Sequence, residues 1–193
     1  VRTERVEVDV RDASTPVNDL IDHRAPDLIL VNDDDLTYAK IRLDQRSFAT
    51  LVESIDTFED SLPRALCWGS AWDMTRDAEL PADDFVELVL AGVGGESDLT
   101  AVAALLRQGQ SAVSLFTADA DRPELAERWE SGLRRLVTTA KAGSDHQLAF
   151  VRAFAGAASG PDYLRELLDG RLDGLAVDAD LRWTLVKALA RIG

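Results

Sequence analysis

The chain has 193 residues, and its 21 Lys and Arg against 35 Asp and Glu give a formal net charge of −14. Such a charge repels nucleic acid and anionic membrane surfaces, so we expect neither as a partner. A single cysteine excludes an intrachain disulfide and any multi-cysteine metal site, while 46% apolar residues suffice for a substantial core. No apolar run approaches the roughly 20 residues of a membrane span. Because the chain begins at Val1 rather than Met, we expect it to be part of a longer protein.

Residues 1–44 show the two-residue rhythm of β-strands. Apolar and polar residues alternate over 6–10, and residues 28–31 form a short apolar run typical of a buried strand. Alternation returns over 38–43, after the sequence NDDD at 32–35, whose side chains favour tight turns. The pattern therefore predicts strands here, two of which form a hairpin with a four-residue loop.

From about Gln45 onward the period becomes helical. An apolar stripe at helical spacing is formed by Leu125, Trp129, Leu133, Leu136 and Val137. Helices are expected over residues 45–56, 61–77, 81–92, 97–109, 111–118, 122–141, 144–158, 161–169 and 178–192.

Several residues mark the expected helix starts. Asp121 followed by Glu124 predicts a capping box, and either Asp178 or Asp180 is expected to cap the last helix. Pro81 and Pro161 lie where helices can begin, because the first turn needs no backbone N–H.

The fold class expected is mainly α: an antiparallel, HEAT- or armadillo-like superhelical stack of helical repeats over 45–193, preceded by a few β-strands over 1–44. Short polar connections between helices of 10 to 20 residues favour that arrangement, although no strict sequence period is present. The last helix ends at Ile192 and Gly193 without a polar closing repeat. Either the stack is incomplete, or the glycine simply terminates the helix.

The sequence offers little for a metal site. Neither His23 nor His146 has a second histidine four residues along the chain, as a zinc-binding helix would require. His23 is expected in a loop and His146 in the first turn of a helix. Residues 33–35 lack the spacing and the turning glycine of a calcium loop, so they are interpreted as a solvated turn.

Motifs for covalent catalysis and phosphate binding are similarly weak. Cys67 is interpreted as a small buried side chain rather than a nucleophile. Ser70 is not in a nucleophile elbow, because Trp72 occupies the position of the second glycine. The glycines of residues 92–95 lack both the required third glycine and a preceding strand, which favours a helix-to-helix connection.

Two further groups of side chains leave alternatives open. Trp68 and Trp72 are four residues apart on one helix face, which favours core packing over a ligand-stacking platform. The pair Arg134 and Arg135, with Arg165, could clamp a peptide carboxylate, but exposed helix arginines balanced by nearby acids are the default. No catalytic, cofactor-binding or metal-binding residue is assigned.

Two segments carry a family resemblance. Residues 28–32 (LILVN) and 36–44 (LTYAKIRLD) resemble the close of the β-sandwich domain of aminopeptidase N-type zinc metallopeptidases. Residues 64–81 (RALCWGSAWDMTRDAELP) are similar to the opening of that family's C-terminal helical domain, closest to its actinobacterial branch. The resemblance spans nearly the whole chain, including LRW at 181–183, and rests on the order of strand pair and helices rather than on one diagnostic motif.

The resemblance implies a division of the chain and a role for it. Residues 1–44 would be the end of the β-sandwich domain, and residues 45–193 an incomplete C-terminal helical-repeat domain that caps the active-site chamber. The parent would be a cytoplasmic, zinc-dependent aminopeptidase in which a metal-polarised water and a Glu base attack the scissile carbonyl. Its zinc ligands and catalytic groups would lie upstream, so this region by itself would be inactive and without cofactor. Its partners would be peptide substrates and the upstream catalytic domain.

An alternative of a different class stays open. A stand-alone helical-repeat scaffold would bind a protein through its concave face without enzymatic activity. The parent reading frame discriminates the two, because only the peptidase requires a His-Glu-x-x-His segment several hundred residues upstream.

Overall fold

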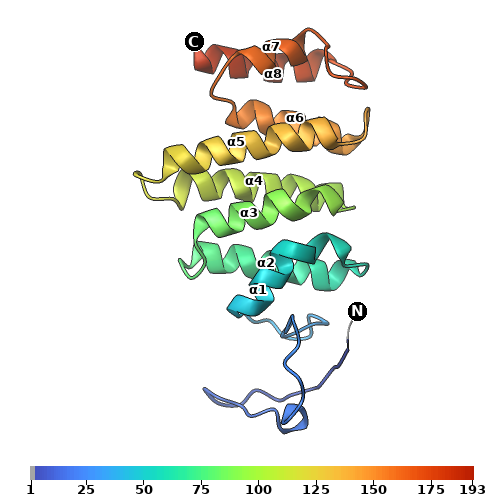
Figure 1. Ribbon diagram of the computed structural model, residues 1–193, viewed down its shortest axis with the longest axis vertical. Coiled ribbons are helices and arrows are strands. Elements are labelled where there is room, and N and C mark those ends of the chain that lie inside the picture. Colours follow the sequence, from blue (N-terminus) through green and yellow to red (C-terminus); the bar gives the residue numbers. More distant parts are fainter. Residues whose placement is uncertain (1–2) are drawn as a thin grey trace.

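The computed structural model describes residues 3–193, and in that range every regular element is a helix (Figure 1). The mainly α prediction is confirmed. The α-helices are α1 (Gln45–Ser54), α2 (Ser61–Arg76), α3 (Ala82–Gly92), α4 (Leu99–Leu115), α5 (Arg122–Thr139), α6 (Asp145–Ala157), α7 (Asp162–Leu168) and α8 (Ala179–Ile192). Short 3-10 turns lie at η1 (Asn18–Leu20), η2 (Ile55–Thr57) and η3 (Val93–Gly95). Over the same range no helix is both long and apolar enough to cross a bilayer.

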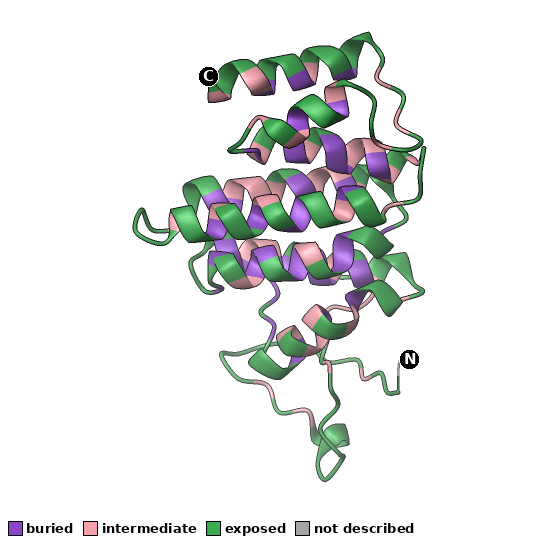
Figure 2. Cartoon of the chain, turned by 45° about the horizontal axis from the view of Figure 1, so that its top comes forward, coloured by how far each residue is buried: buried purple, intermediate pink, exposed green. Residues whose placement is uncertain are grey.

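The helices lie in two layers. In one layer α1 packs on α3 and α3 on α5, while in the other α2, α4, α6 and α8 pack on one another in turn. The chain runs back and forth across the stack, so that successive helices from α2 to α6 are neighbours, as are α7 and α8 (Figure 1). Buried residues recur along the helices, whereas the segment before α1 is mostly exposed (Figure 2).

Most helices begin at an acidic or hydroxyl side chain that accepts free backbone N–H groups, which would otherwise lack partners. The capping residues are Asp44, Asp60, Asp98, Ser144 and Asp178. Asp178, one of the two expected caps of the last helix, accepts from the Leu181 N–H at 2.8 Å. Pro81 and Pro161 stand at the N-cap positions of α3 and α7, as predicted.

The predicted capping box at the start of α5 does not form. Asp121 occupies the N-cap position, but its backbone is helical there (φ −97°, ψ −14°) and its side chain caps nothing. A capping side chain reaches the N–H groups of the first turn from an extended backbone, which Asp121 lacks. The Arg122 guanidinium instead donates to the Thr117 carbonyl at 3.0 Å and closes the α4–α5 turn.

One predicted pair of helices is a single helix. Residues 97–109 and 111–118 were expected to be separate, yet α4 continues unbroken from Leu99 to Leu115. Gly109 stays inside it because of packing: a Cβ atom there would lie 2.5 Å from Cη2 of Trp129. The Trp129 indole N–H donates to Gln110 Oε1 at 3.1 Å, which fixes the ring over the glycine.

The predicted strands of residues 1–44 are not observed: over 3–44 the structure contains only η1 as a regular element. Residues 1 and 2 lie outside the described range. The predicted turn does form, since the Asp35 N–H donates to the Asn32 carbonyl at 2.8 Å and the Asn32 side chain bonds both backbone groups of Thr37. The alternating pattern keeps the chain extended, but a strand also needs ladder hydrogen bonds to a neighbour, and within 3–44 none closes.

The end of this extended segment is anchored on the helices. Ile41 and Leu43 are buried, and Arg42 forms ion pairs with Asp77 at 2.5 Å and with Glu79 in the α2–α3 connection. The Ile29 N–H donates to Ser47 Oγ of α1 at 2.9 Å. The approach of the chain to α1 is therefore fixed by apolar burial and by charge.

Candidate functional site

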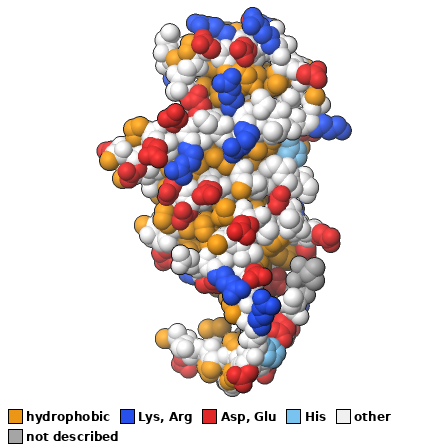
Figure 3. Space-filling view, viewed as in Figure 1, with side chains coloured by type: hydrophobic (Ala, Val, Ile, Leu, Met, Phe, Trp, Pro, Cys, Tyr) orange, Lys and Arg blue, Asp and Glu red, His pale blue; other side chains and the backbone are white. Residues whose placement is uncertain are grey.

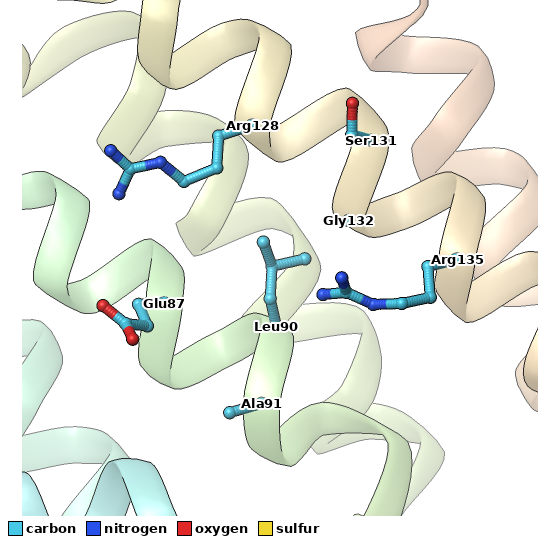
Figure 4. A pocket seen from close by; sticks show the side chains of 7 residues that line it. All are labelled: Glu87, Leu90, Ala91, Arg128, Ser131, Gly132 and Arg135. Carbon is cyan, nitrogen blue, oxygen red and sulfur yellow. The ribbon is translucent and has the colours of Figure 1, made fainter.

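A groove of about 420 Å³ lies between α3 and α5 (Figure 4). Arg128, Ser131 and Arg135 line it from α5, where spacings of three and four residues place them on one helix face. Glu87 and Leu90 line it from α3. The helices approach closely because Gly132 is buried against Leu90, with no room there for a Cβ atom.

A second hollow of about 380 Å³ lies nearby, and Arg128 lines both hollows. It lies where α3 begins and where α4 turns into α5, and its apolar wall includes Phe116 and Leu125. Phe116, 41% exposed, packs edge-on against Trp72 at 5.6 Å between ring centroids.

The two sides of the groove differ in charge. Basic side chains lie over α5, together with acidic ones near its start, and acidic side chains lie over α3, with hydrophobic atoms exposed between the helices (Figure 3). Arg128 lies 3.8 Å from Glu124 of its own helix, whereas no carboxylate among residues 3–193 lies within ion-pair distance of Arg135. On the α3 side, the pKa of Asp84 is raised by partial burial first and then by the charges of Asp83 and Glu87.

A buried ion pair holds the connection between α3 and α4 against α2. The Arg64 guanidinium donates to both carboxylate oxygens of Glu96, at 2.8 and 2.9 Å, and to the Phe58 carbonyl. Both side chains are buried. Glu96 also accepts from the backbone N–H groups of Ser97 and Asp98. Its pKa is lowered chiefly by the Arg64 hydrogen bonds, against an opposing contribution from burial.

Cys67 and Ser70 occupy structural positions on α2. Cys67 is fully buried, and burial raises the pKa of its thiol to about 12, so no thiolate forms near neutral pH. The Ser70 hydroxyl donates to the Leu66 carbonyl at 2.7 Å inside the same helix. The interpretation of Cys67 as a small core side chain is confirmed.

The two histidines lie apart and bond to different partners. His23 is in a loop, with Nδ1 2.7 Å from a carboxylate oxygen of Glu4. His146 is in the first turn of α6, and its Nε2 lies 2.7 Å from the Glu96 carbonyl, to which it donates. No group of three or more His, Cys, Asp and Glu side chains anywhere in 3–193 could hold a metal ion.

The structure also places the two tryptophans and the three arginines of the possible clamp. Trp68 is buried and Trp72 packs on Phe85 at 5.2 Å, so core packing is confirmed for both. The arginines do not form one clamp: Arg134 stacks on the Tyr163 ring at 4.4 Å, and Arg165 faces Asp162 at 3.5 Å. Arg135 lines the groove instead.

The two remaining motifs, residues 92–95 and 33–35, lie in connections between regular elements. Residues 92–95 end α3 and form η3, which confirms a helix-to-helix connection. Residues 33–35 belong to the turn that follows Asn32.

The groove itself was missed by sequence reasoning. Its signal is the spacing of Arg128, Ser131 and Arg135 on the polar side of an amphipathic helix. That spacing is common on solvated helices, and only the packing of α3 against α5 turns it into the wall of a hollow.

Two comparisons with known proteins bear on the chain. Residues 28–193 match the family described as the ERAP1-like C-terminal domain. Over an alignment of 198 residues the chain is 50% identical to a protein named aminopeptidase N from Streptomyces lividans. That alignment includes all of this chain but only 23% of the relative's length. Both findings agree with the resemblance seen in the strand-like and helical segments of the sequence.

Proposed function

This chain belongs to the family of ERAP1-like C-terminal domains, and on that premise we propose that it is part of a zinc-dependent aminopeptidase. The observation that carries the proposal is the 50% identity to aminopeptidase N along the entire chain. The chain spans about a quarter of that relative's length, so the reaction would require polypeptide beyond these residues.

Within such an enzyme, the two helix layers would form a helical-repeat cap over the active-site chamber. A superhelical wall would admit short or flexible peptides and exclude folded chains and bulk water. It could also bind the part of a peptide distant from the scissile bond, which supplies binding energy away from the reacting atoms. The packing of alternate helices within each layer supports this role, because it extends one wall along the stack.

The zinc would be bound by residues outside this chain. Both histidines already have hydrogen-bond partners, and the Cys67 thiol stays protonated in the core. When bound, the metal would supply a polarised water as the nucleophile. In this proposal, the residues described here would contribute no ligand and no acid–base group to that step.

The division at residue 44 is part of the same proposal. Residues 1–44 would be the end of a β-sandwich, and residues 45–193 an incomplete helical domain. Apolar side chains of the first part are exposed, among them Ile29, Val31, Leu36 and Tyr38. Neighbouring strands of a sandwich would cover them and complete their backbone hydrogen bonds. The partners would be that upstream polypeptide and peptide substrates, and the location would be the cytoplasm.

Aminopeptidase assays with two forms of the protein test the proposal. The full product of the native gene should release aminoacyl arylamides and N-terminal residues of peptides, and should lose this activity to a zinc chelator. The 193-residue chain alone should release nothing with zinc added. Zinc-dependent turnover by the short chain, or none by the full product, would contradict the proposal.

A further inference from the structure

We propose that the groove between α3 and α5 binds an extended acidic peptide segment, in which two carboxylates three residues apart pair with Arg128 and Arg135. The inference rests on the proposed function for the source of this ligand, which would be a peptide substrate of the enzyme. It adds a site and a class of side chain that this site prefers.

The geometry of α5 sets the spacing of the ligand. Arg128 and Arg135 are seven residues apart, and a rise of 1.5 Å per residue separates their backbone positions by about 10 Å. An extended chain with three residues per turn repeats on one side about every 9 Å. Carboxylates at positions i and i+3 of such a peptide therefore match the two guanidinium groups.

The groove also supplies contacts between the two charges. Leu90 lies between the arginines in Figure 4 and offers apolar surface, while Ser131 is exposed between them on α5. Beyond Arg128, the hollow at Phe116 can take an apolar side chain of the same peptide. Arginine favours carboxylates in particular, because its planar fork donates two parallel hydrogen bonds.

Several negative charges oppose the ligand, so the inference can be tested by changes of charge. Glu124 lies 3.8 Å from Arg128, and Asp83 and Asp121 line the second hollow. The chain as a whole carries −14, so binding has to come from contacts inside the groove rather than from long-range attraction. Glu87 lines the groove on the α3 side and would repel an incoming carboxylate. Removal of its charge should therefore strengthen binding.

The test measures fluorescence anisotropy of a labelled peptide with the 193-residue chain at about 0.15 M salt, where charges beyond about 8 Å are screened. The probe is an acetylated, amidated peptide with two glutamates separated by two prolines, and the control probe carries glutamines instead. Arg128→Gln and Arg135→Gln should each weaken binding about five-fold, and Glu87→Gln should tighten it. Arg107→Gln on α4, exposed and outside the groove, is the matched control and should change nothing.

Four results of this experiment would contradict the proposed peptide site. Equal binding of the glutamate and glutamine probes, no measurable binding, or equal effects of Arg107→Gln and Arg135→Gln would overturn it. Binding of the same peptide with a free C-terminus but not of the amidated probe would also overturn it, because the proposal assigns both carboxylates to side chains. The measurement needs no catalysis, so inactivity of the full gene product would refute the proposed function and leave the groove result unaffected.

Discussion

The buried pair of Arg64 and Glu96 provides a sharp test of what holds the stack together. We consider Arg64→Met, which keeps the apolar stem and removes the guanidinium. The change leaves the Glu96 carboxylate buried, with backbone N–H donors only from Ser97 at 2.8 Å and Asp98 at 3.2 Å. It also leaves the Phe58 carbonyl without its donor.

The expected cost is large because an uncompensated buried charge remains. Removal of one partner of a buried pair costs about 3–5 kcal/mol of unfolding free energy. Replacement of both partners, in Arg64→Met with Glu96→Leu, removes both charges. What remains is the loss of partners for the Phe58 carbonyl and for the loop N–H groups, about 1–3 kcal/mol. The double variant should therefore be more stable than either single variant.

Urea denaturation followed by circular dichroism at pH 7 measures this order. The four proteins form a double-mutant cycle, and their unfolding free energies give the coupling between the two side chains directly. A double variant less stable than both single variants would refute the reasoning, because it would show that the two losses add. A cost below about 1 kcal/mol for Arg64→Met would refute it as well.

Three further predictions concern the same core. Gly109→Ala should destabilise the chain by about 1–3 kcal/mol, because the new Cβ atom would lie 2.5 Å from Trp129. Gly69→Ala, in open space on α2, should stabilise the chain by about 0.5–1 kcal/mol. Thermal melts of the two variants compare these effects. Cys67 should react with a thiol reagent at pH 8 only after urea unfolds the chain, since its pKa is raised to about 12; fast reaction in native buffer would contradict its burial. Arg64 lowers the pKa of Glu96, so the ion pair stabilises the fold fully above the ordinary carboxyl pKa, and this contribution is lost as pH falls through the lowered pKa. The difference in unfolding free energy between the wild type and Arg64→Met should therefore narrow on acidification. Urea titrations from pH 7 to pH 4 measure this difference.

Local signals located most helices well. Asp178 and Pro161 mark helix starts where the sequence placed them, because a cap is a contact between residues two or three positions apart. The same local rules failed at Gly109 and at Asp121. Gly109 stays helical because of Trp129, twenty residues further on, and the backbone at Asp121 follows a turn closed by Arg122.

The residues of the groove and of the buried pair could not be paired from the sequence. Glu96 and Arg64 are 32 residues apart, and each alone resembles an ordinary surface charge. The composition did limit the kinds of site that the chain could form, because one cysteine and two isolated histidines provide few metal ligands or nucleophiles.

The order and type of the helices, the turn at Asn32 and the acidic character of the surface follow from the sequence alone, because short-range hydrogen bonds, side-chain period and charge determine them. Tertiary structure decided which helices become neighbours. It also decided that residues 38–43 lie extended against α2 rather than in a sheet. Finally, it decided that Arg135 faces a hollow while Arg134 stacks on the Tyr163 ring. These features depend on contacts between residues distant in the chain. Their energies come from packing and desolvation, which no local pattern records.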